Sequence, residues 1–243
     1  MIDIHNHSLY GVDDGPDSIE MSIQMLLEAA KSGIDSIIFT PHYRHHMFGF
    51  PQERIRDAYL TLREEAARRK ETEHLRLYLG CEYHVDSEIY KRLEMRRAWT
   101  LANSEYVLTE YSYTTPYRRM QEYTQELVSR GYRPVLAHIE RYEVFLRDMD
   151  LVEEISRLGG LIQVNADSCL GRAGRKVRKL CRLLLDDGLI DFIASDAHDL
   201  ADRANHLGAC RDLVARRLGE GEAERIFEEN PARILAHGST GIG

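Results

Sequence analysis

Seven short apolar segments recur along the chain, and a segment with helical periodicity follows each of them. They span residues 1–5, 36–40, 75–80, 106–111, 134–139, 161–166 and 191–195. Strands this apolar are buried on both faces, as in a parallel sheet that helices cover on the outside. The pattern therefore predicts an α/β protein whose strands run parallel.

The number of strand–helix units favours a closed sheet. Seven units in 243 residues fit a barrel one repeat short of the eight-fold (β/α) barrel. An open doubly wound sheet is the alternative, but no G-x-G-x-x-G motif follows any of the strands. We predict one domain over residues 1–237 and a frayed tail at 238–243.

Helix signals support this reading. Asp17 and Glu20 form a D-x-x-E capping box before a helix that stops at Gly33. Two amphipathic helices, expected over residues 52–73 and 199–218, are interpreted as cover for the barrel.

Composition and cysteine usage exclude several classes of protein. Thirty-two Lys plus Arg against 40 Asp plus Glu give a net charge of −8, which disfavours a nucleic-acid partner. No apolar run is long enough for membrane insertion, and the N-terminus lacks a secretory signal. The four cysteines form no C-x-x-C pair, so we expect a reducing, cytoplasmic location.

Polar side chains follow every predicted strand. In a parallel barrel the carboxyl ends of the strands meet at one face, where active sites lie. In chain order these residues are His5 and His7; His42; Glu82 and His84; Glu110; His138, Glu140 and Arg141; Asn165 and Asp167; and Asp196 and His198.

Two of these groups point to a metal site with several ions. A lone His or Glu at a strand end is usually a surface residue, but His5-x-His7 and Asp196-x-His198 both fall at strand ends. A His-x-His pair in a strand directs both imidazoles to one face, where they can bind one metal. His84 and Asp167 remain ambiguous.

The charge of the candidate ligands favours phosphate chemistry. The set contains five neutral imidazoles and four carboxylates, with a charge of −4: His5, His7, His42, His138, His198, Asp14, Glu82, Glu110 and Asp196. Three divalent ions would leave about +2 to meet a phosphate dianion, and two would leave the site neutral. Nitrogen and oxygen ligands without thiolate suit Mn, Fe or Zn. Such ions activate a water to hydroxide, so we predict metal-assisted phosphoester hydrolysis.

The motifs, taken together, resemble those of a known superfamily. DIHNH…DDGP, TPHY, GCEYH, TEYSYTTPY, PVLAHIERY, QVN and IASDAH occur in this order over residues 3–198. The set resembles the PHP (polymerase and histidinol phosphatase) superfamily. Within it, the chain is most similar to the bacterial manganese-dependent tyrosine-protein phosphatases linked to capsular and exopolysaccharide synthesis.

The resemblance implies a fold and a set of metal ligands. The fold would be a distorted (β/α)7 barrel that holds two or three ions, which the resemblance implies to be Mn²⁺. One ion would be bound by His5, His7, Glu82 and Asp196; a second by Glu82, Glu110 and His138; a third by Asp14, His42 and His198. Asp13 competes with Asp14 for the ligand role, and the branch pattern favours Asp14.

The resemblance also implies a catalytic set and a substrate. Arg141, Arg203 and His42 would be catalytic, with the two arginines as phosphate-binding cations. Arg203 could equally be a helix-surface residue. The substrate would be phosphotyrosine in a protein, such as the tail of a bacterial tyrosine kinase. Histidinol phosphate, another small phosphomonoester or a phosphodiester is the alternative.

Two rival classes predict different features. A cysteine phosphatase needs a C-x5-R loop, and Cys169 to Arg175 has that spacing, but Ser168 stands where the usual His precedes the Cys. Cys210 to Arg216 has it too, within a predicted helix. A non-catalytic module that docks phosphorylated tails would carry substituted ligands, and none is seen here.

Overall fold

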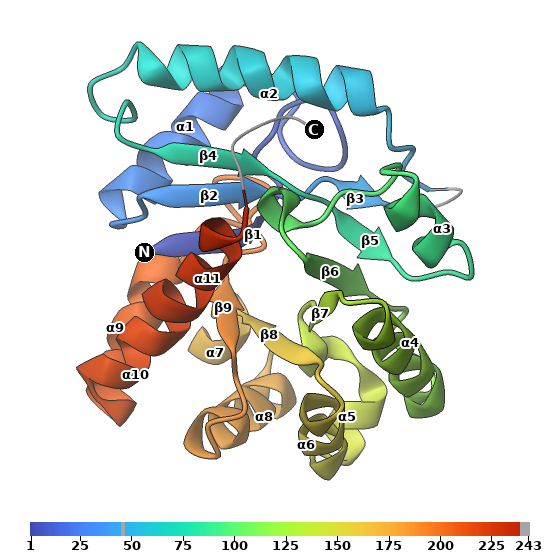
Figure 1. Ribbon diagram of the computed structural model, residues 1–243. Helices are drawn as coiled ribbons and strands as arrows, with labels where there is room; N and C mark the ends of the chain where they lie inside the picture. The colour runs from blue at the N-terminus through green and yellow to red at the C-terminus, as the bar shows by residue number, and fades with distance from the viewer. Residues whose placement is uncertain (45–46, 239–243) are drawn as a thin grey trace.

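The computed structural model describes residues 1–44 and 47–238, and Figure 1 shows a curled parallel sheet surrounded by helices. The predicted α/β class and the parallel, barrel-like sheet are confirmed. Most of the tail predicted to fray, at 239–243, lies outside the described residues, so that expectation stays a prediction.

The strands of the described residues carry these bounds: β1 Ile2–Asn6, β2 Ser36–Phe39, β3 His42–Tyr43, β4 Arg76–Leu79, β5 Glu82–His84, β6 Tyr106–Glu110, β7 Arg133–Leu136, β8 Leu161–Asn165 and β9 Phe192–Ala194. The longer helices are α1 Ile19–Lys31, α2 Gln52–Ala67, α4 Tyr117–Ser129, α6 Asp150–Arg157, α8 Arg175–Asp186 and α9 Leu207–Leu218. Shorter helices are α3 Ile89–Glu94, α5 Glu143–Arg147, α7 Ala166–Leu170, α10 Glu220–Glu224 and α11 Asn230–Ala236.

The strands form two parallel sheets that follow one another around the curl. One has the order β1-β2-β4 and the other β3-β5-β6-β7-β8-β9. The first and last strands meet at their carboxyl ends, where Asp196 N donates to His5 O and His7 N donates to Ala197 O, each at 2.9 Å. This seam brings the two ends of the chain's sheet together and closes the face that carries the polar residues.

The second and third predicted strands are each followed by a further short strand, β3 and β5, which the sequence analysis did not predict. The segment after β2 contains Pro41, which has no N–H to give to a ladder, and β3 begins at the next residue. The segment after β4 contains Gly80, where a Cβ would lie 3.0 Å from the Leu101 side chain. These two breaks distort the barrel and place His42 and Glu82 at the starts of β3 and β5.

Three helix predictions need correction. Helix α1 is capped by Ser18, which accepts from Met21 N, and not by Asp17. Helix α2 ends at Ala67 and not at 73, because the Thr72 hydroxyl donates to Ala66 O at 2.8 Å. Residues 199–206 form no helix, since Asp199 Oδ1 accepts from Ala201 N and Arg203 N at 2.7 and 3.0 Å.

The core lies in two clusters on opposite sides of the sheet. Alternate strand residues, such as Ile37 and Ile193, pack under the helices. Their neighbours Ile38, Leu108 and Ala194 form a smaller cluster inside the barrel. Because this cluster fills the barrel interior with apolar side chains, polar side chains gather beyond it, at the carboxyl ends of the strands. Among the described residues, the helices are all too short or too polar to cross a membrane.

Candidate metal centre

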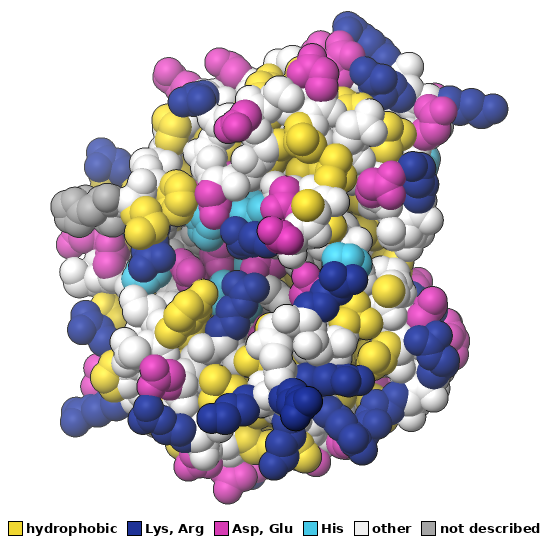
Figure 2. Space-filling view, turned by 180° about the vertical axis from the view of Figure 1, so that it is seen from behind, with side chains coloured by type: hydrophobic (Ala, Val, Ile, Leu, Met, Phe, Trp, Pro, Cys, Tyr) yellow, Lys and Arg dark blue, Asp and Glu magenta, His cyan; other side chains and the backbone are white. Residues whose placement is uncertain are grey.

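Histidine side chains gather with acidic and basic ones in a hollow on one face of the molecule (Figure 2). Three overlapping groups there have ligand atoms close enough to share an ion: His5, His7 and Asp196; His7, Asp14, His42 and His198; and His42, Glu82 and Glu110. These groups contain eight of the nine predicted ligands, and the ninth, His138, contacts Glu82.

The first group surrounds the Nε2 atoms of His5 and His7, which lie 3.1 Å apart. His5 Nε2 lies 3.4 Å from Glu82 Oε2 and 3.4 Å from Asp196 Oδ1. Asn165 Nδ2 donates to the other Asp196 oxygen at 2.7 Å and so holds that carboxylate in place.

Three imidazoles are oriented through the nitrogen on their far side. The Nδ1 atom of His5 lies 3.1 Å from Gln163 Oε1, and that of His7 lies 2.8 Å from Asp13 Oδ2. The Nδ1 atom of His198 lies 2.9 Å from the backbone carbonyl oxygen of Asp196. Because each of these partners is an acceptor, the neutral ring carries its proton on Nδ1. The three Nε2 atoms then present lone pairs to the site, which is how protein metal ligands are commonly prepared.

Glu82 lies at the centre of the cluster. Its Oε1 is 2.8 Å from His138 Nε2, and its Oε2 is 2.9 Å from His42 Nδ1. Burial would raise the pKa of Glu82, but His5 and His42 outweigh burial and hold it well below its usual value. The pKa of Glu110 is raised by burial and by the charge of Glu82. The negative charge of Glu82 is therefore balanced by the neighbouring imidazoles, whereas that of Glu110 is opposed by Glu82.

Asp14 lies between two imidazoles at the outer side of the cluster. Its Oδ1 is 3.2 Å from His198 Nε2 and 3.3 Å from His42 Nε2. Asp13 faces the other way: its Oδ2 meets His7 Nδ1 and accepts from His42 N at 3.1 Å. Asp14 thus faces the Nε2 atoms of His42 and His198, and Asp13 orients His7; the ligand role of Asp14 stays a prediction.

The loop that carries these two aspartates requires a glycine. Gly15 N donates to Asp13 Oδ1 at 3.1 Å, and a Cβ on Gly15 would lie 2.1 Å from His7 O. No side chain fits so close to a backbone carbonyl. The DDG stretch of the sequence is explained by this contact.

The residues fit divalent ions by their chemistry. Within the described part of the chain, the buried atoms Glu82 Oε2, Glu110 Oε2 and His198 Nε2 accept or donate no well-formed hydrogen bond, although Glu82 Oε2 lies near His42 Nδ1 and His198 Nε2 near Asp14 Oδ1. Buried polar atoms normally have one. Lone pairs of imidazole and carboxylate that face each other without a proton between them need a cation, and mixed nitrogen and oxygen donors suit Mn, Fe or Zn.

Without such ions, the neighbouring carboxylates raise the pKa of two imidazoles. Burial alone would lower the pKa of His5, but Glu82 and Asp196 raise it to about 9. The pKa of His42 is likewise raised to about 11 by Glu82 and Asp14 against the effect of burial. These are the same contacts that ions would take over.

Two guanidinium groups reach the same carboxylates. Arg141 Nη1 lies 3.1 Å from Asp196 Oδ2, and Arg203 Nη1 lies 3.1 Å from Asp14 Oδ2. The side chains are 29% and 39% exposed, so both remain accessible at the mouth of the site. Arg203 is therefore not a helix-surface residue, because the turn held by Asp199 directs it to the site.

Two ligand candidates adopt unusual backbone conformations. His138 and Asp196 have φ values of 35° and 52°, in the left-handed region that non-glycine residues uncommonly adopt and in which His and Asp are among the more frequent of them. Such positions persist only where the surrounding structure enforces them, and they cluster at functional sites.

Some strand-end residues lie outside the cluster. Glu140 accepts from Asn165 N, His84 contacts Ser112, and Asp167 lies beside His206 and Arg172. One buried residue that the sequence analysis gave no role, Gln163, meets both His5 Nδ1 and His138 N. The signal for it was a polar residue in the middle of an apolar strand.

The cysteine-phosphatase alternative is contradicted. Cys169 is 5% exposed and lies within α7, so it faces no phosphate loop. Although a contact with Cys181 opposes it, the neighbouring Cys210 and burial raise the pKa of the Cys169 thiol well above its usual value. A nucleophilic cysteine needs the opposite shift.

Comparison with known proteins agrees with this geometry. Residues 1–236 match the family model described as "Capsular polysaccharide synthesis, CpsB/CapC". The chain is 32% identical over 240 residues to the tyrosine-protein phosphatase CpsB of Streptococcus pneumoniae, covering 97% of this chain and 98% of that protein. It is 29% identical to the tyrosine-protein phosphatase YwqE of Bacillus subtilis, covering 97% and 91%.

Solved structures extend the comparison to the fold. One described as "YwqE from Bacillus subtilis and CpsB from Streptococcus pneumoniae, unique metal-dependent tyrosine phosphatases" superposes with a TM-score of 0.91 at 27% identity, over 99% of this chain and 96% of that one. An organophosphorus hydrolase of Deinococcus radiodurans shares the fold alone, at a TM-score of 0.59 and 16% identity, over 96% and 92%. The resemblance found in the sequence is confirmed: this chain belongs to the CpsB/CapC family of capsular polysaccharide synthesis proteins, whose named relatives here are tyrosine-protein phosphatases.

Proposed function

We propose that this chain is a metal-dependent phosphatase that hydrolyses phosphotyrosine in proteins. The observation that carries the proposal is the orientation of three imidazoles: the Nε2 atoms of His5, His7 and His198 face a cluster of carboxylates. Two arginines lie at the mouth of the same site, next to these carboxylates. Family membership supports the choice of substrate, because the relatives are tyrosine-protein phosphatases.

The proposed ligand sets are those that the family resemblance implies, and they overlap the three groups without repeating them: His138, which contacts Glu82, takes the place of His42 beside Glu82 and Glu110. His5, His7, Glu82 and Asp196 would hold one ion; Glu82, Glu110 and His138 a second; and Asp14, His42 and His198 a third. When bound, divalent ions supply Lewis-acid activation of water and of the phosphate oxygens. Mn²⁺ is the metal we propose, as the family resemblance implies, with Fe or Zn as alternatives.

The protein's own groups bind and orient the phosphate. Arg141 and Arg203 now pair with Asp196 and Asp14. A guanidinium can give two parallel hydrogen bonds to a phosphate, so these two would hold its outer oxygens while the inner ones face the ligand cluster. His42, 12% exposed and next to both Glu82 and Asp14, completes the proposed catalytic set.

Aromatic side chains at the mouth are consistent with an aryl phosphate as the substrate. Phe48 stacks on His42 with ring centroids 4.9 Å apart, and Tyr113, which is 53% exposed, lies within electrostatic reach of Arg141. Rings at this position can pack against a phenyl group. A tyrosine-phosphorylated kinase of polysaccharide synthesis is the partner we propose. The four free, buried cysteines support a cytoplasmic location.

The test is phosphate release from a phosphotyrosine peptide and from histidinol phosphate, after chelation and again after Mn²⁺ is restored. We expect the peptide to be the better substrate, turnover to need the metal, and His138→Ala or Arg141→Ala to abolish it. Cys169→Ala should leave the activity unchanged. Faster turnover of histidinol phosphate would refute the substrate, and activity that resists chelation would refute the metal.

A further inference from the structure

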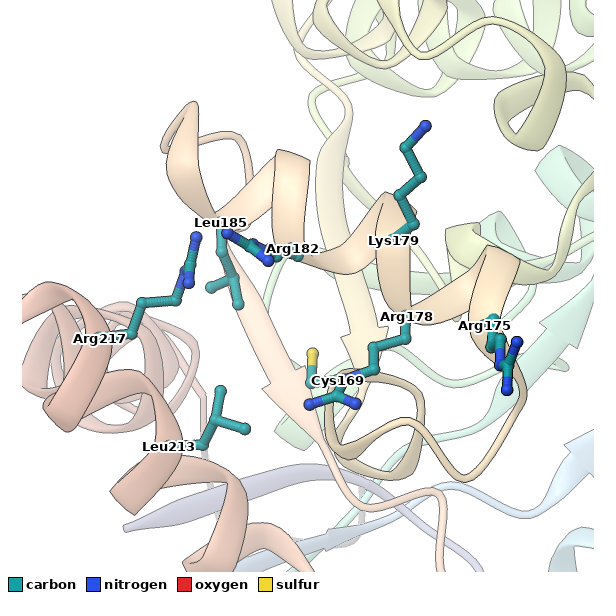
Figure 3. Close-up of a pocket in the computed structure, with 8 residues that line it drawn as sticks. All are labelled: Cys169, Arg175, Arg178, Lys179, Arg182, Leu185, Leu213 and Arg217. Carbon is teal, nitrogen blue, oxygen red and sulfur yellow. The ribbon is translucent and has the colours of Figure 1, made fainter.

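A strongly basic cavity that shares no residue with the metal centre lies between α7, α8 and α9. Its volume is about 460 Å³. Five cationic side chains line it: Arg175, Arg178, Lys179, Arg182 and Arg217. Figure 3 shows Arg178 next to Cys169 at the floor, with Arg175 toward one end and Arg182 and Arg217 toward the other.

Most of these cations have no counter-charge in the described part of the chain. Only Arg182 and Arg217 have an acidic partner there, and both share Asp186. Arg175, Arg178 and Lys179 form no ion pair with any described residue. Such a concentration of unpaired positive charge is notable in a chain whose net charge is −8.

Contacts within the fold hold the cationic side chains in place at both ends of the cavity. Gly171, with φ of 91°, lies under Arg178, so that a Cβ there would come within 2.7 Å of Arg178 Cδ. At the far end, Arg217 Nε and Nη2 donate to the two oxygens of Asp186 at 2.8 and 2.6 Å. The guanidinium groups are therefore placed around the cavity by contacts of the fold.

The cavity lies on the substrate side of the molecule. Helix α7 follows β8 directly, and β8 ends at Asn165, which holds the metal-site carboxylate Asp196. Helix α8 begins at Arg175, a few residues later. Figure 2 agrees, because Lys and Arg side chains gather below the histidines on the same face, toward the edge where α8 lies in Figure 1.

The lining selects for a class of ligand. No aromatic ring lines the cavity among the described residues, so nothing is offered for a nucleobase to stack on. The apolar part, made by Cys169, Leu185 and Leu213, forms a floor with cations around it. This suits carboxylate or phosphate groups on a flexible chain that crosses the rim.

Building on the proposed function, we propose that this cavity binds an acidic or phosphorylated segment of the protein whose phosphotyrosine occupies the metal centre. It would act as a second anchoring point that selects protein substrates with clustered negative charge. The Cys169–Arg175 stretch, which resembles a phosphate loop only by its spacing, would thus contribute its arginine to binding and its cysteine to the floor.

The experiment compares two phosphotyrosine peptides that differ only in a flanking tract, glutamate in one and glutamine in the other. Steady-state kinetics are measured for the Mn²⁺-loaded wild type, for Arg175→Gln/Arg178→Gln/Lys179→Gln, and for the matched control Arg68→Gln/Arg69→Gln/Lys70→Gln. The control residues are exposed and adjoin the end of α2, on the opposite side of the barrel in Figure 1.

For the glutamate peptide we expect the cavity variant to raise KM about three- to tenfold at unchanged kcat, because each exposed charge pair contributes little. The glutamine peptide and the control variant should show no change. Equal KM for both peptides with wild type, or equal effects of both variants, would overturn the inference. So would binding of anionic phospholipid vesicles that the cavity variant alone abolishes, with peptide kinetics unaffected. If neither the wild type nor the two variants hydrolyses either phosphotyrosine peptide, the proposed function itself is refuted.

Discussion

At the scale of single residues, the site depends on side chains that no ion would touch. Gln163 and Asp13 each accept from the Nδ1 of a histidine, and this contact fixes which nitrogen faces the cluster. A neutral imidazole free to turn would present the wrong atom for part of the time, so these residues pre-organise the ligands.

Gln163→Leu removes the acceptor for His5 while keeping a buried side chain of similar size. We expect metal affinity to fall about 10- to 100-fold with the fold retained, which is the usual range for a lost outer partner of a ligand. Competition with a fluorescent chelator measures the affinity, and circular dichroism checks the fold. Gln125→Leu, at an exposed position of α4, is the control; equal affinity in the two variants would contradict the role of Gln163.

The roles of Asp13 and Asp14 can be distinguished by counting the metal ions that each variant binds per chain. Asp14→Asn should reduce the number of ions bound per chain by one, because Asp14 Oδ1 lies between His42 and His198. Asp13→Ala should preserve that number and weaken binding, since Asp13 contacts the far side of His7 and the backbone N–H groups of His42 and Gly15. Mass spectrometry of the metal content decides, and the reverse result would exchange the two roles.

At the scale of elements, the ends of the strands and the loops that follow set the geometry. The breaks after β2 and β4 place His42 and Glu82 at the starts of short strands. The loop after β1 folds back on the His7 carbonyl, which requires Gly15. The loop after β9 is a turn held by Asp199, and it directs Arg203 to Asp14.

Gly15→Ala tests the loop after β1. A methyl group 2.1 Å from His7 O must displace Asp13, so we expect a loss of about 1–3 kcal/mol in unfolding free energy and weaker metal binding. Urea denaturation measures the first. Gly221→Ala, in α10 with no atom within 4 Å of the new Cβ, should instead be neutral or stabilise by up to about 1 kcal/mol. Similar curves for both variants would rule out the close contact.

At the scale of the whole molecule, the site joins the two ends of the chain. Residues 189 apart, Arg203 and Asp14, meet there, and the β1–β9 seam passes beneath them. Ions bound at this seam hold strands from both ends of the sheet. Binding to the folded state alone therefore stabilises the whole domain.

The pH dependence of stability tests this coupling. In the chelated protein, the raised pKa of His5, about 9, gives stability that is complete below about pH 6.5 and is lost as pH rises through 9. The Tm of the chelated protein should therefore fall between about pH 7 and 9. A bound divalent ion would replace the proton, so the metal-loaded protein should lack this fall and release protons on loading at pH 7. Parallel Tm curves for the two forms would contradict the assignment.

Much of the site could be predicted from the sequence because its ligands occupy the ends of periodic segments. His5 and His7, or Asp196 and His198, are separated by one residue at a strand end, and the strand period alone places them together. The environment of Arg203 could not be predicted, since an amphipathic pattern over 199–218 suggested a helix that the Asp199 side chain prevents. Gln163 was missed because its partners come from β1 and from the residues after β7.

The sequence by itself determined the fold class, the family and the residue types available at each strand end, since all of these depend on local periodicity and on short motifs. Only the tertiary structure decided which nitrogen of His5, His7 and His198 faces the site, which aspartate meets the Nε2 atoms of His42 and His198, and where the unpaired arginines of α8 gather. Those choices depend on hydrogen bonds and charges between segments that meet only when the sheet curls and its first and last strands pair.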